Sequence, residues 1–188
     1  MTKFIKQFST LSVLAMSLFL WSCDNIGQTT APTGDLNPRG YAIFSSTTGE
    51  QFVVIRESED LGIVSGSIGA AGGELHLGNH SLYVPEGAVE QSTVFTMSRA
   101  DDELVRLRLS ATVNDHNDVG SAGFEKPVRL TISFSGAEDL PESTDKLEVI
   151  YFRPDGLVDP QSTWLDVSNE SASGELPHFS DFGLAWPF

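Results

Sequence analysis

The sequence has one cysteine and few basic residues. Cys23 is the only cysteine among 188 residues, so an internal disulfide is excluded. Lysine and arginine number 11 against 26 aspartate and glutamate residues, which gives a formal net charge of −15 at pH 7. A chain this acidic repels the phosphates of DNA and RNA, and we therefore expect no nucleic-acid partner. The acidity itself indicates a solvated surface and no particular site.

Long apolar runs are absent after the first 22 residues. Lys3 and Lys6 stand in an acid-free start, and an uncharged apolar run follows from Phe8 to Trp21. This order is typical of a secretory signal peptide. The run is shorter than the roughly 18 to 20 apolar residues that a membrane-spanning helix needs. We therefore predict that residues 1–22 form a cleaved signal peptide.

The single cysteine stands where the apolar run stops. Leu20 lies three residues before Cys23 and Ser22 lies directly before it, which resembles the lipobox of bacterial lipoproteins. The resemblance implies that the Cys23 thiol is diacylated and anchors the protein to a membrane. Each buried acyl CH₂ contributes about 0.8 kcal/mol to membrane affinity, so several chains hold the protein durably. A leftover free thiol is the alternative. Asp24 resembles an inner-membrane retention signal of enteric-type bacteria, but other lineages read this position differently and the leaflet stays open.

A polar segment would follow the anchor. Residues 23–40 contain two prolines and three glycines, which predicts a flexible tether. Loss of Lys3 and Lys6 with the signal leaves nine basic residues and a formal charge of −17. The remaining residues, 41–188, have the length of one domain with a single core.

No stretch of this domain has a sustained helical period of apolar residues. Short alternating runs are instead separated by Gly, Pro, Asn and Asp, as where Val105, Leu107 and Leu109 alternate with Arg106 and Arg108. The pattern predicts an all-β fold, a single β-sandwich of about 8 to 10 mostly antiparallel strands. The predicted strands are Gln51–Glu57, Glu74–Leu77, Ser81–Val84, Thr93–Ser98, Leu104–Val113, Val128–Phe134, Leu147–Phe152, Trp164–Val167 and Phe179–Trp186.

Four segments together resemble the ZU5 domain, which is known from ankyrins, netrin receptors and exported bacterial proteins. They are Gly69–Leu75 (GAAGGEL), Leu82–Val89 (LYVPEGAV), Phe124–Val128 (FEKPV) and His178–Phe182 (HFSDF). Each segment alone is weak, but their order and spacing agree with the family, and the ZU5-like part covers about residues 66–188. The resemblance implies a β-sandwich that serves as an interaction or structural module.

The sharpest chemical hypothesis concerns His178, Phe179 and Ser180. Some ZU5 relatives cut themselves between the Phe and Ser of this motif. By that resemblance, Ser180 Oγ would attack the Phe179 carbonyl carbon, His178 would act as base, and water would hydrolyse the resulting ester. The reaction needs a strained peptide. A closing strand in which these side chains are only structural is the alternative that we favour, because a cut would free just residues 180–188.

Two groups of side chains could hold a metal ion, and each has a simpler interpretation. Asp115, Asn117 and Asp118 lie in an Asx-rich stretch that resembles a calcium loop, but the spacing is not that of an EF-hand and turn chemistry is the alternative. His76 and His80 are four residues apart, which aligns side chains on a helix but not across two strands. With no cysteine as a third ligand, we expect these histidines to be exposed or hydrogen-bonded.

Several aromatic residues would suit sugar stacking if they lined an exposed face. They are Trp164, Trp186, Tyr151 and Phe152, and their place in alternating strands favours core packing. The sequence therefore predicts a non-catalytic lipoprotein of the bacterial cell envelope, facing the periplasm or the cell exterior and displaying a ZU5-like sandwich to a protein partner or for support. No cofactor is predicted beyond the lipid on Cys23. Self-cleavage is the first alternative, and calcium or glycan binding the second.

Overall fold

The computed structural model of this chain describes residues 41–57, 61–100, 103–113, 117–118 and 124–188. The predicted signal peptide (1–22), Cys23 and the predicted tether (23–40) lie outside the described residues. The described ranges contain fourteen strands and two three-residue 3₁₀ helices, η1 (Thr144–Lys146) and η2 (Val167–Asn169). No helix within these ranges is long and apolar enough to cross a bilayer.

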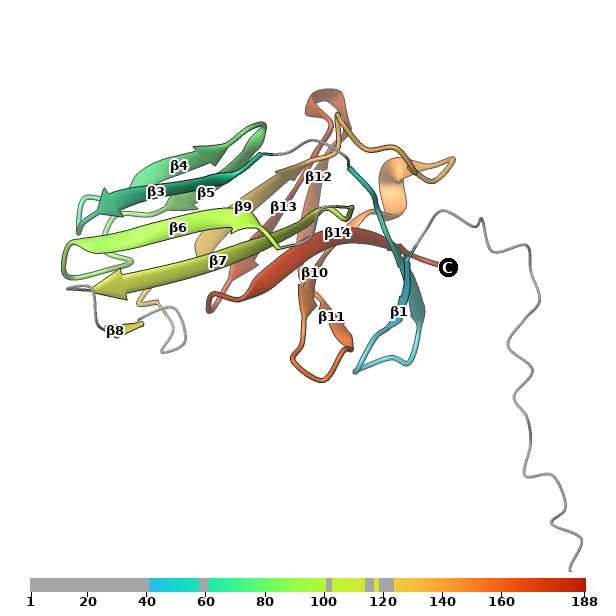
Figure 1. The fold of residues 1–188 in the computed structure, drawn as a ribbon, viewed down its shortest axis with the longest axis horizontal. Coiled ribbons are helices and arrows are strands. Elements are labelled where there is room, and N and C mark those ends of the chain that lie inside the picture. Colours follow the sequence, from blue (N-terminus) through green and yellow to red (C-terminus); the bar gives the residue numbers. More distant parts are fainter. Residues whose placement is uncertain (1–40, 58–60, 101–102, 114–116, 119–123) are drawn as a thin grey trace, which may run out of the picture. The chain divides into compact units, whose positions relative to one another are not determined.

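The strands form two antiparallel sheets that pack together (Figure 1), which confirms the predicted all-β sandwich. The first sheet has nine strands: β1 (Tyr41–Phe44), β2 (Gln51–Val54), β3 (Ile63–Ile68), β6 (Thr93–Arg99), β7 (Arg106–Val113), β8 (Asn117–Asp118), β10 (Glu148–Phe152), β11 (Val158–Pro160) and β14 (Asp181–Pro187). The second sheet has the order β12 (Thr163–Asp166), β13 (Ser171–Leu176), β9 (Val128–Ser133), β5 (His80–Val84) and β4 (Gly73–Leu77).

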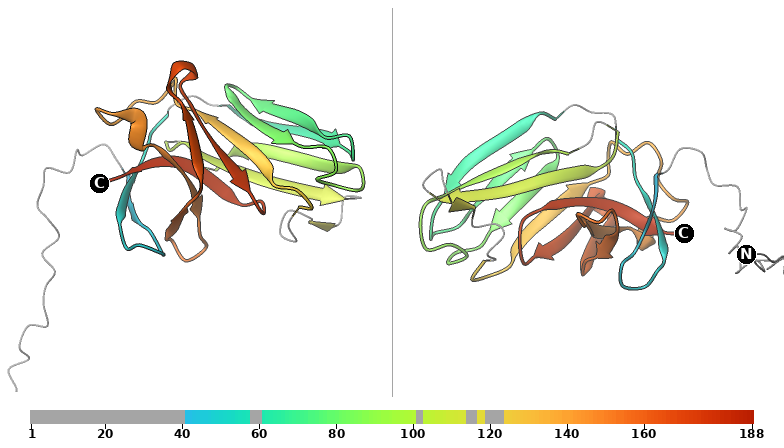
Figure 2. Two further views of the ribbon diagram at one scale, coloured as in Figure 1. Left: turned by 180° about the vertical axis from the view of Figure 1, so that it is seen from behind. Right: turned by 60° about the horizontal axis from the view of Figure 1, so that its bottom comes forward.

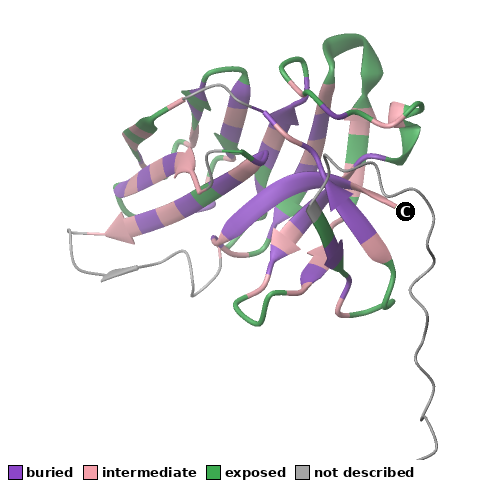
Figure 3. Ribbon diagram, turned by 45° about the vertical axis from the view of Figure 1, so that its right-hand side comes forward, coloured by how far each residue is buried: buried purple, intermediate pink, exposed green. Residues whose placement is uncertain are grey.

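The last strand, β14, joins the parts of the first sheet. Along one edge it pairs with β7 near its start and with β2 near its end, and along the other edge it pairs with β10. The strand is buried from Asp181 to Ala185, and in Figure 3 the ribbon that leads to the C-terminus is purple over most of its length. Because the strand has neighbours on both edges and cover on both faces, its backbone is shielded from water.

Two hydrophobic clusters account for this burial. The main core lies between the sheets and receives Phe182 and Leu184 from β14. The second core receives Ala185 from the same strand, together with Ile150 and Phe152 of β10. Because neighbouring residues of a strand point to opposite faces, β14 separates the two cores and contributes to both.

Gly183 makes the close packing of β14 possible. An added Cβ there would lie 2.4 Å from the carbonyl oxygen of Val105 and 2.7 Å from the ring of Phe152. The hydrogen atom of glycine leaves that space to the Phe152 ring. The guanidinium of Arg106 lies over the same ring, 4.5 Å from its centre. The second core therefore continues into a charged cluster at the surface.

All nine predicted strands are present, but the sequence pattern misses β1, β3, β8, β11 and β13. β3 (IVSGSI) and β13 (SASGEL) are rich in serine and glycine, so they lack the large apolar residues that mark a strand. In β13 the buried positions are held by Ala172, Gly174 and Leu176. The predicted strand Phe179–Trp186 also begins later, at Asp181, so His178–Ser180 precede the strand.

Candidate functional site

The four segments singled out in the sequence meet at one corner of the sandwich. The first two are in backbone contact: Gly72 has a φ of +73°, and an added Cβ would lie 2.5 Å from the carbonyl oxygen of Val84. Only glycine combines that backbone conformation with such a close approach. The amide of Gly87 also donates a hydrogen bond to the carbonyl of Ala70, 2.8 Å away.

The third segment closes on the second through two hydrogen bonds. Lys126 Nζ donates to the carbonyl oxygen of Glu86 at 2.6 Å. The amide of Glu125 donates to the carbonyl of Ala88 at 3.3 Å. Both bonds hold the start of β9 against the loop that follows β5. The loop before Val128 and the loop after Val84 are thus hydrogen-bonded to each other.

The fourth segment joins the corner through Phe179. Its buried ring lies edge-to-face with Phe124, with ring centres 4.7 Å apart, and with Phe95 of β6, 5.6 Å apart. Aromatic pairs at these distances stabilise by about 0.5–1.5 kcal/mol beyond simple burial. Residues far apart in the sequence therefore share one aromatic cluster.

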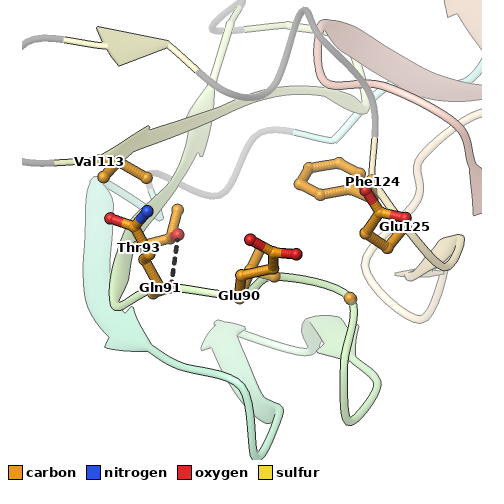
Figure 4. A pocket seen from close by; sticks show the side chains of 8 residues that line it. Glu90, Gln91, Thr93, Val113, Phe124 and Glu125 are labelled. Carbon is orange, nitrogen blue, oxygen red and sulfur yellow. Dashed lines mark hydrogen bonds between the residues drawn. The ribbon is translucent and has the colours of Figure 1, made fainter.

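A pocket of about 210 Å³ opens beside this cluster (Figure 4). Apolar side chains line it together with two carboxylates and one amide; the lining residues are Ala88, Val89, Glu90, Gln91, Thr93, Val113, Phe124 and Glu125. Thr93 Oγ1 donates to the carbonyl of Gln91 at 3.0 Å, which fixes the loop at the pocket's edge. The volume is below the roughly 300 Å³ at which small-molecule sites begin, so the space suits a single side chain rather than a cofactor.

His178 and Ser180 are engaged in packing and in backbone pairing. The His178 imidazole lies edge-on to Tyr151, with ring centres 5.0 Å apart. The carbonyl oxygen of Ser180 accepts a hydrogen bond from the Leu109 amide at 2.9 Å. A nucleophile and its base require a hydrogen bond of about 2.6–3.2 Å, and none joins His178 to Ser180 in the described part of the chain.

The backbone around this motif has no residue with a positive φ angle. Glu170 is the one non-glycine residue with positive φ in the described ranges, and it lies at the end of η2. Phe179 and Ser180 therefore have negative φ, as ordinary L-residues do. The contacts of Phe179 and His178 can hold the start of β14 in place.

Asp181, the first residue of β14, is the strongest electrostatic feature of this region. Its side chain is 12% exposed and accepts a hydrogen bond from Arg106 Nη2 at 2.7 Å and two from Arg108, Nε at 2.9 Å and Nη2 at 3.0 Å. Burial alone would raise the pKa of this carboxyl. The hydrogen bonds and charges of Arg108 and Arg106 outweigh burial and hold the pKa below its ordinary value. The alternation in β7 predicts that the arginines face outward, but not that they bind Asp181.

The two histidines considered as metal ligands point to opposite sides. His76 is exposed on β4, whereas His80 on β5 is 1% exposed. His80 Nδ1 accepts a hydrogen bond from the Ser133 amide at 3.1 Å, so the imidazole proton is on Nε2, 3.4 Å from Glu57 Oε2. One exposed and one hydrogen-bonded histidine agree with the sequence expectation. In the described ranges no three Asp, Glu, His or Cys side chains come together as metal ligands.

The calcium candidates fall at the edge of what the structure describes. Asp115 lies outside the described residues. Asn117 and Asp118 form β8, whose backbone pairs with Val113 and Thr112 at the end of β7. A calcium loop involving these residues stays a prediction.

The aromatic residues considered for sugar stacking do not share one face. Trp164 is 53% exposed on β12, so the expected core packing is wrong for this residue: β12 is the edge strand of the second sheet, and Trp164 lies on its solvent side. Phe152 is buried in the second core. Tyr151 and Trp186 are partly buried against the main core.

No protein-family model and no curated protein matches the sequence.

Replacing Asp181 with asparagine should destabilise the protein in a pH-dependent way. Loss of the carboxylate leaves two arginines without their acceptor, and we expect the free energy of unfolding at pH 7 to fall by about 1–3 kcal/mol. Because the folded-state pKa of Asp181 is depressed, its contribution is complete above the unfolded pKa of about 3.9 and is lost as pH falls through the folded value. The difference between wild type and Asp181→Asn, measured by urea unfolding, should therefore shrink as pH is lowered from 5 toward 2.

Glu175→Gln serves as the control for this experiment. Glu175 is an exposed carboxylate on β13, and its substitution removes the same formal charge. We expect a change within about 0.5 kcal/mol at every pH. An Asp181→Asn effect that is small at pH 7, or that has the same size at pH 7 and pH 2, would contradict the role given to the arginine pair.

Proposed function

We propose that this chain is a non-catalytic lipoprotein of the bacterial cell envelope that displays a ZU5-like β-sandwich as a protein-interaction or structural module. The single observation that carries the proposal is the meeting of the four motif segments at one corner, through the contacts of Gly72, Gly87, Lys126 and Phe179. Segments that resemble one family and also build one structural unit support a common architecture. The family resemblance in turn supports an interaction or structural role.

The contacts of the motif residues support a structural role rather than a catalytic one. Phe179 belongs to the aromatic cluster, His178 packs on Tyr151, and the Ser180 carbonyl pairs with β7. Each of these contacts keeps the chain in register just before β14. A cut after Phe179 would separate the aromatic cluster from the strand that it positions.

The membrane anchor of the proposal rests on the sequence. The signal-like start, the lipobox-like Leu20–Cys23 and the polar residues 24–40 form a consistent order of signal, anchor and tether. In this arrangement the domain faces the periplasm or the cell exterior. The formal charge of −17 keeps such a domain soluble near the bilayer.

Denaturing mass spectrometry of the protein from a bacterial host tests anchor and catalysis together. We expect one intact chain that begins with acylated Cys23, because cleavage follows lipid attachment and Ser180 does not attack its neighbour. Cys23→Ala should lose the acyl mass, whereas Ser180→Ala should leave the wild-type pattern unchanged. An unmodified Cys23 would contradict the anchor. A released peptide of residues 180–188 that disappears in Ser180→Ala would contradict the non-catalytic assignment.

The pocket beside Phe124 is where we place the contact with a protein partner, since its volume suits one inserted side chain. A photo-crosslinking amino acid at Gln91, an exposed residue of the pocket, should capture a discrete partner in the native host. The matched position is Glu142, which is exposed but not part of the pocket. Crosslinking at Gln91 alone supports the assignment. Equal patterns at both positions, or none at Gln91, contradict it.

A further inference from the structure

Two aromatic side chains are exposed on one face at the end of the first sheet. Phe44 of β1 is 54% exposed and Phe188, which follows β14, is 59% exposed. Phe44 lies opposite Gln51 of β2 in the strand register, and the Phe188 amide donates to the carbonyl of Gln51 at 2.8 Å. Residues in one cross-strand row point to the same side of a sheet. The backbones of Phe44 and Phe188 therefore flank that of Gln51, about two strand spacings or 10 Å apart.

The next row on this face continues the apolar surface. Ala42 lies two residues before Phe44, and Trp186 lies two residues before Phe188. Ala42 and Trp186 both pair with Val53 of β2. Ala42 is exposed, and Trp186 is partly buried against the main core. We call Ala42, Phe44, Trp186 and Phe188 the terminal patch. It is an exposed apolar surface with an aromatic base that is fixed to the core.

The terminal patch lies at the end of the domain where the described chain begins. Tyr41, the first described residue, is the start of β1 and pairs with Val54. Val54 pairs in turn with Ala185 of β14. In Figures 1 and 2 the C-terminus and β1 lie at the same end in every view. Any anchor that precedes Tyr41 is therefore attached beside the patch.

The length of the preceding segment determines what can cover the patch. Seventeen residues separate Cys23 from Tyr41. The flexible tether that the composition of this segment predicts would have a mean end-to-end distance of about 23 Å, from 5–6 Å multiplied by the square root of the residue number. A lipid on Cys23 thus keeps this end of the domain close to a bilayer at high effective concentration. Tryptophan favours the interface between lipid headgroups and acyl chains, and phenylalanine is common on the apolar face of interfacial segments.

We propose that the terminal patch inserts into the headgroup region of the bilayer that holds the lipid of Cys23, so that the domain rests on the membrane by its β1–β2–β14 end. This inference rests on the proposed lipid anchor and adds to it a second, protein-mediated membrane contact. The contact fixes the orientation of the domain. The pocket beside Phe124 is lined by the β5–β6 loop, the start of β6, the end of β7 and the residues that precede β9, all outside the strands that touch the membrane.

Acidic residues at this end of the domain indicate that the membrane contact is apolar rather than electrostatic. Glu50 directly precedes β2, and Glu148 of β10 is paired with Ala185, so Glu148 lies at the same end of the sheet on the face opposite to Trp186. Burial, and then the charge of Glu50, raise the pKa of Glu148, which indicates that these carboxylates act on each other. Two acidic groups at this end repel anionic headgroups. The insertion should therefore be stronger in phosphatidylcholine than in phosphatidylglycerol vesicles.

Tryptophan fluorescence offers a direct test because, after signal cleavage, the chain has two tryptophans, Trp164 and Trp186. The lipidated protein is incorporated into phosphatidylcholine vesicles that contain lipids brominated near the headgroup, and vesicle flotation measures anchoring independently. In Trp164→Phe the remaining Trp186 should lose about half of its fluorescence, since bromine quenches on contact at interfacial depth. In Trp186→Phe the remaining Trp164, on the edge of the other sheet, should be unaffected.

Substitutions in the patch complete the experiment. Phe44→Ser with Phe188→Ser, made in the Trp164→Phe background, should abolish the quenching while flotation persists; both side chains are exposed, so the fold is retained. Val167→Ser, at an exposed apolar residue of η2, is the matched control and should change nothing.

The outcomes separate the two proposals. Protein that does not float overturns the lipid anchor and with it the membrane contact. Protein that floats with Trp186 unquenched overturns the membrane contact alone. If the patch instead joins two copies of the chain, Trp186 stays unquenched and the Phe44→Ser, Phe188→Ser protein sediments as a smaller species than wild type, which also contradicts membrane insertion.

Discussion

The position of β14 between β7, β2 and β10 is the constraint on which the rest of the structure depends. Its side chains enter both cores, with Leu184 on one face and Ala185 on the other. Its start is fixed by the ion pairs of Asp181, and the space that Gly183 leaves lets β10 approach. A strand that is paired on both edges and covered on both faces cannot leave without exposing both clusters to water. The domain is therefore closed by its last strand rather than by its first.

The residues before β14 have a structural role that follows from this constraint. His178, Phe179 and Ser180 link the corner where the four motif segments meet to the strand that closes the fold. In the structure His178 packs on Tyr151, Phe179 belongs to the aromatic cluster, and the Ser180 carbonyl accepts a hydrogen bond from the Leu109 amide. The proposed functions then occupy separate places: the pocket beside Phe124 serves a partner, and the terminal patch faces the membrane. A lipid-anchored module needs both an orientation and a free contact surface.

The fold class could be predicted because alternation in β7 and β9 reports burial directly, residue by residue. β13 could not, since two of its three buried positions are filled by alanine and glycine, which carry little apolar signal. The exposure of Trp164 could not be predicted, because alternation indicates which residues share a face but not whether another sheet covers that face. Asp181 and its arginines, like the pocket, depend on segments brought together by the topology. A local sequence pattern does not contain pairings of this kind. The hydrogen bond from the Ser133 amide to His80 in the core could not be predicted for the same reason.

Native-state hydrogen exchange tests most directly whether β14 and the segment before it close the fold as one unit. Two amides are the informative probes. The Leu109 amide donates to the Ser180 carbonyl, and the Leu184 amide donates to the Val105 carbonyl. The account predicts that both exchange only by global unfolding, with the same free energy and the same dependence on denaturant as the slowest amides of the main core. Exchange of Leu109 through a smaller opening, at a free energy well below the global value, would contradict it, because residues 178–181 would then detach while the sandwich remained folded.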